Sequence, residues 1–468
     1  MVFSSLIFLF LFLPATLLIY YMSPKGLRNV VLLVASLIFY AWGEPVYILI
    51  MIFTTVFDYC NGLLIDRYRH RKPIARAVLI GSIIGSLGIL SFFKYAGFVL
   101  DNINQLFHLH IQAADLPLPV GISFYTFQTM SYVIDVYRGQ IPVQRNIIHF
   151  GTYVTMFPQL VAGPIIKYGD IAKQLVSRKV TLEGFGEGAE CFIRGLAKKV
   201  LLANNIGLLW ANVKATPSED LSILSAWLGI IAFTFQIYFD FSGYSDMARG
   251  LGKMFGFDLV KNFNYPYISK SITEFWRRWH ISLGSWFREY VYIPLGGNRL
   301  GLLKQFRNLL VVWFLTGLWH GANWNFIIWG LYFGLFVTVE KLFLLKWLQR
   351  SPTFMAHIYT LLIVIVGWVW FDFDHLASSL KFIGVMFGYG ANGIADDQAF
   401  YALSTHPVLL ILLALCATPL PGKVLSHVKE KWGVAGAIAV PAVCFILMVL
   451  STAYLVDDTY NPFLYFRF

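Results

Sequence analysis

Long apolar runs, separated by short polar loops, dominate the pattern of hydrophobic and polar positions along the chain. A helix needs about 20 mostly apolar residues to cross a bilayer, so the runs predict about 11–13 membrane helices, some short enough to be re-entrant or interfacial. The runs are Phe3–Met22, Val30–Trp42, Pro45–Ile65, Ala77–Phe93, Val120–Val136, Ile147–Val161, Phe185–Trp210, Ile223–Met247, Asn308–Leu318, Trp324–Phe343, Ile358–Phe371, Val408–Leu420 and Val434–Leu455. The pattern predicts an all-α, polytopic membrane protein with a single domain over residues 1–468.

Composition supports a lipid environment. Hydrophobic residues make up 58% of the chain and charged residues 13%, whereas soluble domains carry about 25% charged residues. The net charge of +11 lies in basic patches between apolar runs, so we interpret it as membrane topology and not as a nucleic-acid surface. The first run has no basic residue before it and Lys25 and Arg28 after it, which favours a retained first helix over a secretory signal.

The distribution of charge predicts an orientation, because short cytoplasmic loops collect Lys and Arg. The basic loops, which we assign to the cytoplasm, are Lys25/Arg28, Arg67–Arg76, Arg138/Arg145, Lys167–Lys179, Arg249–Arg307, Lys341–Arg350 and Lys423–Lys431. The neutral or acidic loops, which we place outside, contain Glu44, Asp101, Asp115, Glu219, Asp220, Asp372, Asp374, Asp396, Asp397, Asp457 and Asp458. Both termini then lie outside the cytoplasm, provided that the run Ile147–Val161 is re-entrant.

A polar, aromatic and basic segment from Gln236 to Gly334 interrupts this rhythm and is the predicted catalytic region. Within it, His320 lies in the stretch Leu-Trp-His-Gly-Ala-Asn, which ends at Asn323, between two apolar runs. Ionisable groups at membrane depth are costly and usually functional, and burial favours the neutral imidazole, which can accept a proton. A core histidine bonded to a backbone carbonyl is the alternative.

A second stretch, Ser271–Ser282, contains Trp-Arg-Arg-Trp-His. On one continuous helix, Trp276, His280 and Gly284 would share a face. The guanidinium groups of Arg277 and Arg278 suit phosphates, although anchoring to lipid headgroups explains them equally well.

A third polar stretch lies inside an apolar run, where Asp240 and Tyr244 stand one helical turn apart. They either line a polar passage or, as the preferred interpretation, belong to a buried ion pair. No His or Cys stands at ligand spacing beside them, so no metal site is predicted. The stretches Leu118–Tyr125 and Phe157–Pro164 contain Pro and Gly and predict kinks.

Together these motifs resemble the membrane-bound O-acyltransferase family, most closely the branch that acetylates bacterial exopolysaccharides such as alginate. The similarity covers most of the chain and is looser after about Lys346. Its most specific parts are the Trp-Arg-Arg-Trp-His stretch ending at His280 and the Leu-Trp-His-Gly-Ala-Asn stretch around His320. The resemblance implies a ring of membrane helices around a tunnel, with His320 as the hallmark catalytic histidine and His280 as the second family position.

The resemblance also implies the chemistry and the partners. We expect acetyl-CoA as a donor substrate, with no bound cofactor, its polar head against Arg277, Arg278 or Lys270 on the cytoplasmic side. Trp276, Asp240, Tyr244 and Asn323 are further candidates for substrate binding. The resemblance implies a bacterial inner membrane location, a periplasmic serine-esterase-like partner that accepts the acetyl group, and a polysaccharide biosynthesis and secretion complex.

Three alternatives remain open from the sequence. One is a D-alanine transferase of the same family, fed by a carrier protein. Another is a transporter or flippase for a lipid-linked sugar, although the two halves of the chain lack the matching broken helices of an inverted repeat. The third is a structural scaffold for a secretion complex, which would tolerate loss of both His280 and His320.

Overall fold

Helices make up most of the computed structural model, which describes residues 1–112, 116–161, 163–457 and Leu464. No strand occurs in these ranges, which confirms the all-α prediction. The predictions that concern Asp115, Asp458 and the C-terminal end of the chain fall outside the described residues.

The chain divides into two compact units. The first contains Met1–Phe192 and Tyr244–Val260, and the second contains Ile193–Gly243 and Lys261–Phe468. Both divisions fall inside helices, α9 (Leu182–Ala197) and α11 (Ile223–Met254). The single-domain organisation therefore stays a prediction.

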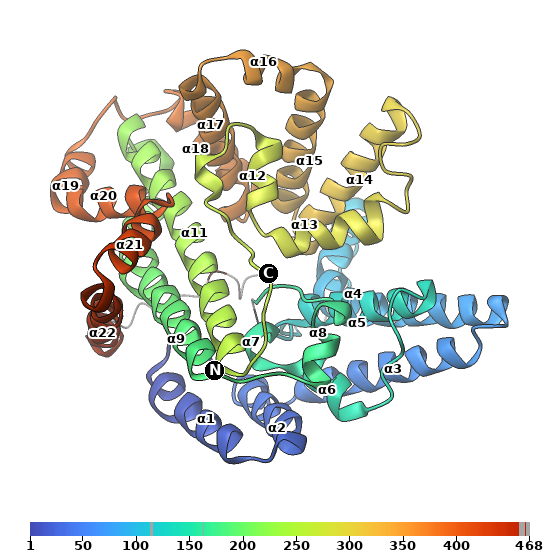
Figure 1. Cartoon of the computed structure of the whole chain (residues 1–468). Coiled ribbons are helices and arrows are strands. Elements are labelled where there is room, and N and C mark those ends of the chain that lie inside the picture. The colour runs from blue at the N-terminus through green and yellow to red at the C-terminus, as the bar shows by residue number, and fades with distance from the viewer. Residues whose placement is uncertain (113–115, 162, 458–463, 465–468) are drawn as a thin grey trace. The chain divides into compact units, whose positions relative to one another are not determined.

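The first unit is built around α5, of which all but three residues are buried. This helix packs against α3 and α4, and α4 has 36 residues, about 54 Å at 1.5 Å per residue. Besides the N-terminal part of α9 and the C-terminal part of α11, the helices of this unit are α1 (Leu13–Met22), α2 (Arg28–Ala41), α3 (Ile48–Arg67), α4 (Lys72–Phe107), α5 (Ile122–Arg138), α6 (Ile147–Thr155), α7 (Phe157–Leu160) and α8 (Tyr168–Val176) (Figure 1).

The second unit carries the motif-rich segment. Its helices, besides parts of α9 and α11, are α10 (Asn205–Ala215), α12 (Ile272–Arg278), α13 (Ile281–Phe287), α14 (Leu302–His320), α15 (Trp324–Val339), α16 (Leu345–Arg350), α17 (Thr353–Asp372), α18 (Leu376–Met386), α19 (Asp397–Thr405), α20 (Pro407–Cys416), α21 (Leu420–Lys431) and α22 (Gly433–Asp457). Helix α15 packs between α14 and α17, and the short helix α12 contacts both α15 and α17.

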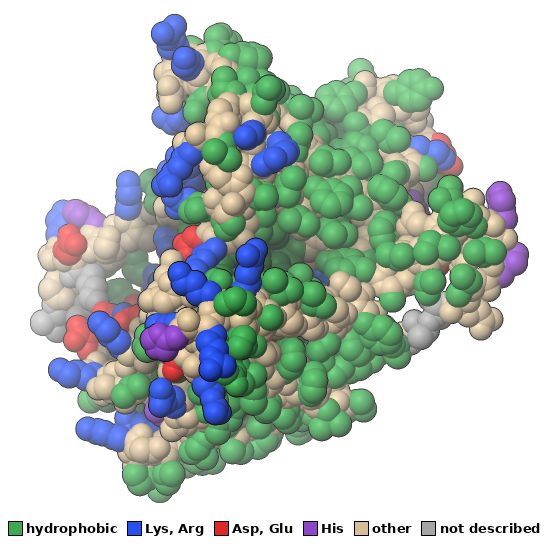
Figure 2. All heavy atoms as spheres, turned by 90° about the vertical axis from the view of Figure 1, so that its right-hand side faces the viewer, with side chains coloured by type: hydrophobic (Ala, Val, Ile, Leu, Met, Phe, Trp, Pro, Cys, Tyr) green, Lys and Arg blue, Asp and Glu red, His purple; other side chains and the backbone are tan. Residues whose placement is uncertain are grey.

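Within the described ranges, six helical segments are long and apolar enough to cross a membrane, and a seventh forms if the bent pair α19–α20 is one span. The six are Ile48–Arg67, Lys72–Phe107, Ile223–Met254, Trp324–Arg350, Thr353–Asp372 and Ile438–Asp457. Figure 2 shows a face covered mostly by hydrophobic side chains, with Lys and Arg gathered toward one edge. The protein is therefore a membrane-embedded, multi-pass protein.

Several predicted runs are shorter or more broken than expected. The first run forms the shorter apolar helix Phe8–Met22. The run Ile147–Val161 breaks at Met156, between α6 and α7, directly before Phe157-Pro158. Proline has no backbone N–H and restricts the preceding residue, so it favours a break at this point. Helix α18 was not predicted.

Candidate active site

The hairpin of α14 and α15 positions His320, because His320 is the last residue of α14 and α15 begins four residues later. The two helices meet backbone to backbone. A Cβ on Gly317 would lie 2.2 Å from the carbonyl oxygen of Phe326, and one on Gly330 would lie 2.3 Å from that of Trp313. Small residues allow such contact between membrane helices, and this contact fixes the end of α14.

The His320 imidazole is 4% exposed and is enclosed by aromatic rings, which we call the His320 surround: Trp319, Phe326, Trp329 and Phe371. The centroids of Trp329, Trp319 and Phe371 lie 4.9, 5.0 and 5.2 Å from the imidazole centroid. Phe326 lies 6.5 Å away, roughly parallel to it. A Cβ on Gly321 would lie 2.2 Å from the Phe326 ring, so the glycine after the histidine is what allows this ring to approach.

His280 does not lie on the continuous helix that the sequence predicted. Helix α12 ends at Arg278, Trp279 is extended, and His280 has the left-handed angles φ 44° and ψ 55° before α13 begins. The shared face of Trp276, His280 and Gly284 was therefore wrong. A non-glycine residue in this region costs about 1–3 kcal/mol, a strain that concentrates at functional sites.

Two fully buried polar side chains hold the backbone on either side of this strained residue. The main-chain carbonyl oxygen of Asn262 accepts a hydrogen bond from the N–H of Ile281 (3.0 Å), and its side-chain Oδ1 accepts one from the N–H of Ser282 (3.1 Å). The Glu340 carboxylate accepts from the N–H groups of Ile272 (2.6 Å) and Thr273 (2.8 Å), at the start of α12. Glu340 is only 1% exposed, so these amides satisfy a carboxylate that water does not reach.

Trp319 connects the two histidines. Its ring centroid lies 6.0 Å from that of His280 and 5.0 Å from that of His320, so the two imidazoles are at most about 11 Å apart. The Phe241 ring also packs on His280, roughly perpendicular to the imidazole, with the two ring centroids 4.8 Å apart. Burial lowers the pKa of His280, which lies outside the membrane-spanning helices, to about 3, so this imidazole is neutral at physiological pH.

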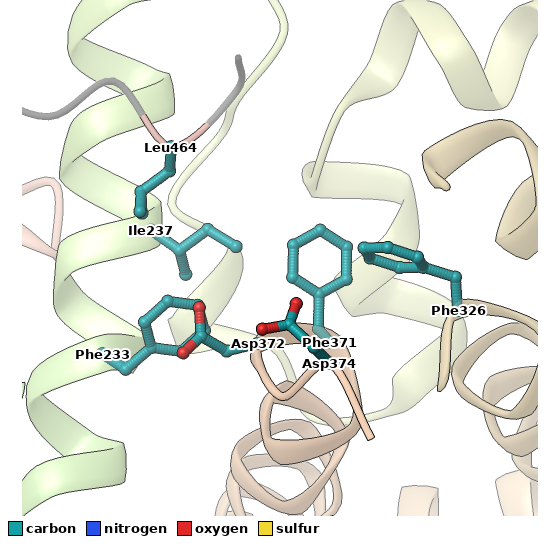
Figure 3. A pocket seen from close by; sticks show the side chains of 7 residues that line it. All are labelled: Phe233, Ile237, Phe326, Phe371, Asp372, Asp374 and Leu464. Atoms are coloured by element: carbon teal, nitrogen blue, oxygen red, sulfur yellow. The ribbon is translucent and has the colours of Figure 1, made fainter. Parts of the chain in front are cut away.

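A cavity of about 60 Å³ adjoins the His320 surround. Figure 3 shows its lining, with Phe233, Ile237 and Leu464 on one side, Phe326 and Phe371 on the other, and the carboxylates of Asp372 and Asp374 between them. Because Phe326 and Phe371 also pack on the imidazole, these two rings belong both to the cavity lining and to the His320 surround. The tunnel that the sequence resemblance implied stays a prediction.

The loop that carries the two aspartates is tied to the His320 motif. Asn323 caps α15 through its Oδ1, and its Nδ2 donates to the carbonyl oxygen of Asp374 at 2.7 Å. Asn325 donates to the carbonyl oxygen of Phe373. Asp372 accepts hydrogen bonds from Lys214 (2.6 Å) and Trp210 (2.9 Å). Asn323 was predicted to bind substrate, and the structure gives it these two positioning contacts.

The predicted donor-binding residues occupy different environments. Trp276 packs among Trp313, Trp329 and Phe333, next to the His320 surround. Arg278 pairs with Glu274 at 2.8 Å. Lys270 and Arg277 are exposed, so both cations are accessible. A role for these residues in donor binding stays a prediction.

Asp240 and Tyr244 lie on α11, and the contacts of each fall within a different unit. The Asp240 carboxylate pairs with Lys199 at 2.7 Å, and both side chains are almost completely buried. This is the buried ion pair that the sequence favoured. Lys199 also donates to Asn204. Tyr244 stacks on Phe3 within the first unit, at a centroid distance of 4.4 Å.

Sequence reasoning missed the residues that surround the two histidines. Phe326, Trp329 and Phe371 sit in apolar runs where an aromatic side chain is unremarkable, and their meeting depends on the packing of α14, α15 and α17. Glu340 carried a usable signal, since it is an acidic residue at the end of an apolar run, directly before a basic loop. Such a carboxylate needs a partner when it is buried.

Comparison with known proteins places this geometry in context. A family model described as MBOAT, membrane-bound O-acyltransferase family, matches residues 141–373. The chain is 39% identical to a probable alginate O-acetylase, AlgI, of Azotobacter vinelandii over the full length of both proteins. It is 46% identical to the corresponding protein of Pseudomonas syringae pv. tomato, over 83% of this chain and 76% of that protein. It is 32% identical to a peptidoglycan O-acetyltransferase of Helicobacter pylori, over 100% of this chain and 98% of that protein.

Proposed function

Because the chain belongs to the membrane-bound O-acyltransferase family, we propose that this acyltransferase moves an acetyl group from cytoplasmic acetyl-CoA to an extracytoplasmic hydroxyl, for O-acetylation of an exopolysaccharide. The observation that carries the proposal is His320, which lies at the end of α14 inside an aromatic surround and beside a cavity lined by Asp372 and Asp374. The similarity to alginate O-acetylases over the full chain supports acetyl as the group and an alginate-like polymer as the final target.

The reaction needs a base for the acceptor and stabilisation of the oxyanion. The hydroxyl oxygen attacks the thioester carbonyl carbon, the new C–O bond forms, and the C–S bond breaks. His320 accepts the hydroxyl proton, which then passes to the departing thiolate. His280 orients the acyl carbonyl, or donates a hydrogen bond to the developing negative charge. A site free of bulk water strengthens both interactions.

The two sides of the membrane have different tasks in this proposal. The CoA phosphates stay on the basic cytoplasmic side, within reach of the exposed Lys270 and Arg277. The acceptor arrives from the side of Asp372 and Asp374, which the charge pattern places outside the cytoplasm. We propose that the immediate acceptor is the serine of a periplasmic esterase-like partner within a polysaccharide secretion complex, and that the protein resides in the bacterial inner membrane with both termini outside.

The test is a donor assay on the purified full-length protein in lipid nanodiscs. Radiolabelled acetyl-CoA, offered with glycerol as a small acceptor alcohol, should yield labelled acetyl ester or acetate, and unlabelled CoA thiol in equal amount. Absence of both products above the level of empty nanodiscs would contradict acetyl-CoA as the donor. Release of D-alanine from a D-alanyl carrier protein in a parallel reaction would then favour the other branch of the family, and no turnover of either thioester would favour a transporter.

A further inference from the structure

The cavity beside His320 is small. Its volume is about 60 Å³, enough for a few water molecules, each of which needs about 10–15 Å³ in this measure. A hydroxymethyl group fits such a space. The cavity is therefore suited to one slender alcohol arm that projects from a larger acceptor.

The two carboxylates that line the cavity are not equivalent. The charge of Asp372 is balanced by the Lys214 ammonium at 2.6 Å, and Trp210 donates a further hydrogen bond to it. Asp374 is exposed, and among the residues that the structure describes no cation pairs with its carboxylate. As far as the described residues extend, Asp374 therefore contributes a negative charge without a paired cation at the wall of the cavity.

The position of Asp374 is fixed by the motif that carries His320. Asn323 donates to its backbone carbonyl oxygen, and Asn325 donates to that of the preceding residue, Phe373. These contacts hold the backbone of Asp374 beside the His320 surround, and its carboxylate projects from that fixed point. It can accept a hydrogen bond from a hydroxyl, and it repels an acceptor that carries its own negative charge near the reacting hydroxyl.

We propose that Asp374 selects the acceptor, and that the cavity admits a slender alcohol that is neutral or cationic near its hydroxyl and excludes an anionic one. The inference rests on the proposed function and extends it. A uronate unit of an acidic polymer carries a carboxylate on the ring that bears its hydroxyls, so it is disfavoured here as the direct acceptor. A protein serine on a neutral or basic surface satisfies both the size and the charge.

The test uses three alcohols that differ in one group: glycerol, its anionic analogue glycerate, and its cationic analogue 3-amino-1,2-propanediol. Each is offered with radiolabelled acetyl-CoA to the full-length protein in nanodiscs, and ester formation is measured beside acetate release. We expect ester formation to be slowest with glycerate, by about fivefold relative to glycerol, the scale of one exposed charge interaction. Asp374→Asn should abolish this preference, and Asp374→Lys should reverse it.

Asp397→Asn is the matched control, because Asp397 is an exposed carboxylate of the same unit in the first turn of α19, outside the cavity lining. It should leave the preference unchanged. The proposal is overturned if the glycerate-to-glycerol ratio is the same in the wild type, Asp374→Asn and Asp374→Lys, or if acetate is released but none of the three alcohols is esterified. Failure of the proposed function differs, because neither acetate nor ester then forms in the wild type.

Discussion

Two regions of the second unit bury ionisable groups, and they do so in opposite ways. Lys199 and Asp240 pair with each other at 2.7 Å, and Asn204 satisfies a further donor position of the lysine. His280 and His320 instead lie among aromatic rings, with Trp319 in contact with both. In the first region, the charge of each side chain is balanced by the opposite charge of the other. In the second region, the two imidazoles are packed mainly against aromatic rings.

The difference separates a structural role from a chemical one. A buried ion pair is held together by its own attraction, and loss of one partner leaves an uncompensated charge. A neutral imidazole tolerates an apolar surround at lower cost, and there it keeps the capacity to exchange a proton with a substrate. We therefore expect substitutions in the ion pair to act on stability and substitutions of the histidines to act on rate.

The largest expected effect is that of His320→Ala on acetyl transfer. Loss of a general base typically lowers the rate by about 10²–10⁴-fold. The amount of protein in the membrane and its thermal unfolding midpoint in detergent should stay close to those of the wild type. Turnover of labelled acetyl-CoA, normalised to protein amount, is the measurement. Normal acetylation by this variant would remove His320 from the mechanism.

The next largest effect should follow from Asp240→Ala, which leaves the Lys199 ammonium buried without its partner. Breaking a buried pair in this way costs about 3–5 kcal/mol, whereas replacing both members by apolar residues is often close to neutral. We expect a clear fall in the unfolding midpoint for Asp240→Ala and recovery in the double variant Asp240→Leu/Lys199→Met. If the double variant is the less stable of the two, the ion pair has a role beyond charge compensation.

These contrasts indicate how far the sequence could predict the molecule. Helical class and membrane insertion could be predicted, because apolar run length is a local signal. The two histidines could be singled out as candidates, because polar groups are rare in such runs, and their catalytic role stays a prediction. The sequence predicted a buried ion pair for Asp240 but not its partner. Lys199 lies 41 positions earlier in the chain, and only the packing identifies it. The break at His280 was missed because the residues on both sides favour a helix, and the tertiary contacts of Asn262 override that preference.

The surround of His320 could not be predicted for a related reason. Phe326 and Phe371 are far apart in sequence. Phe326 reaches the imidazole because glycines bring α14 and α15 into backbone contact, and Phe371 reaches it from α17, which packs on α15. Among the described residues six helical segments pass as membrane spans by length and composition, and α4 and α11, of 36 and 32 residues, extend well beyond the runs that predicted them. Several of the shorter apolar runs form short or broken helices. The ends of these helices depend on the segments that pack against them, which the hydrophobic pattern does not reveal.

A smaller effect is expected for Glu340→Gln, which sharpens the comparison because the buried Glu340 carboxylate is held by backbone N–H groups, whereas Asp240 is held by a cation. Its contacts with Ile272 and Thr273 anchor α12, which leads to His280. Hydrogen bonds to a charged group contribute about 1.5–3 kcal/mol, and we expect a fall in kcat of about tenfold with KM for acetyl-CoA unchanged.

Glu340→Asp should recover part of the lost kcat if the carboxylate positions His280. Glu219→Gln, in the exposed 3₁₀ helix Ser218–Asp220 of the same unit, is the matched control and should behave as the wild type. A rise in KM with kcat unchanged would instead assign Glu340 to binding of the donor. Equal losses in Glu340→Asp and Glu340→Gln would indicate a general packing defect.

The smallest expected effect concerns the pH dependence that His280 contributes. Its pKa of about 3 in the folded protein lies below the ordinary value of about 6.5, so the imidazole is already neutral throughout the range from pH 5 to pH 8. His280→Asn should lower acetyl-CoA turnover but leave the shape of the pH profile in that range unchanged.

The same lowering of the His280 pKa makes the wild type lose stability as the pH falls below about 6.5, because only the unfolded chain then binds the proton. His280→Asn should lack this loss. An acid limb near pH 6.5 that disappears in His280→Asn would mean that the imidazole titrates in contact with water, and the contrast between its apolar surround and the Lys199–Asp240 pair would not hold.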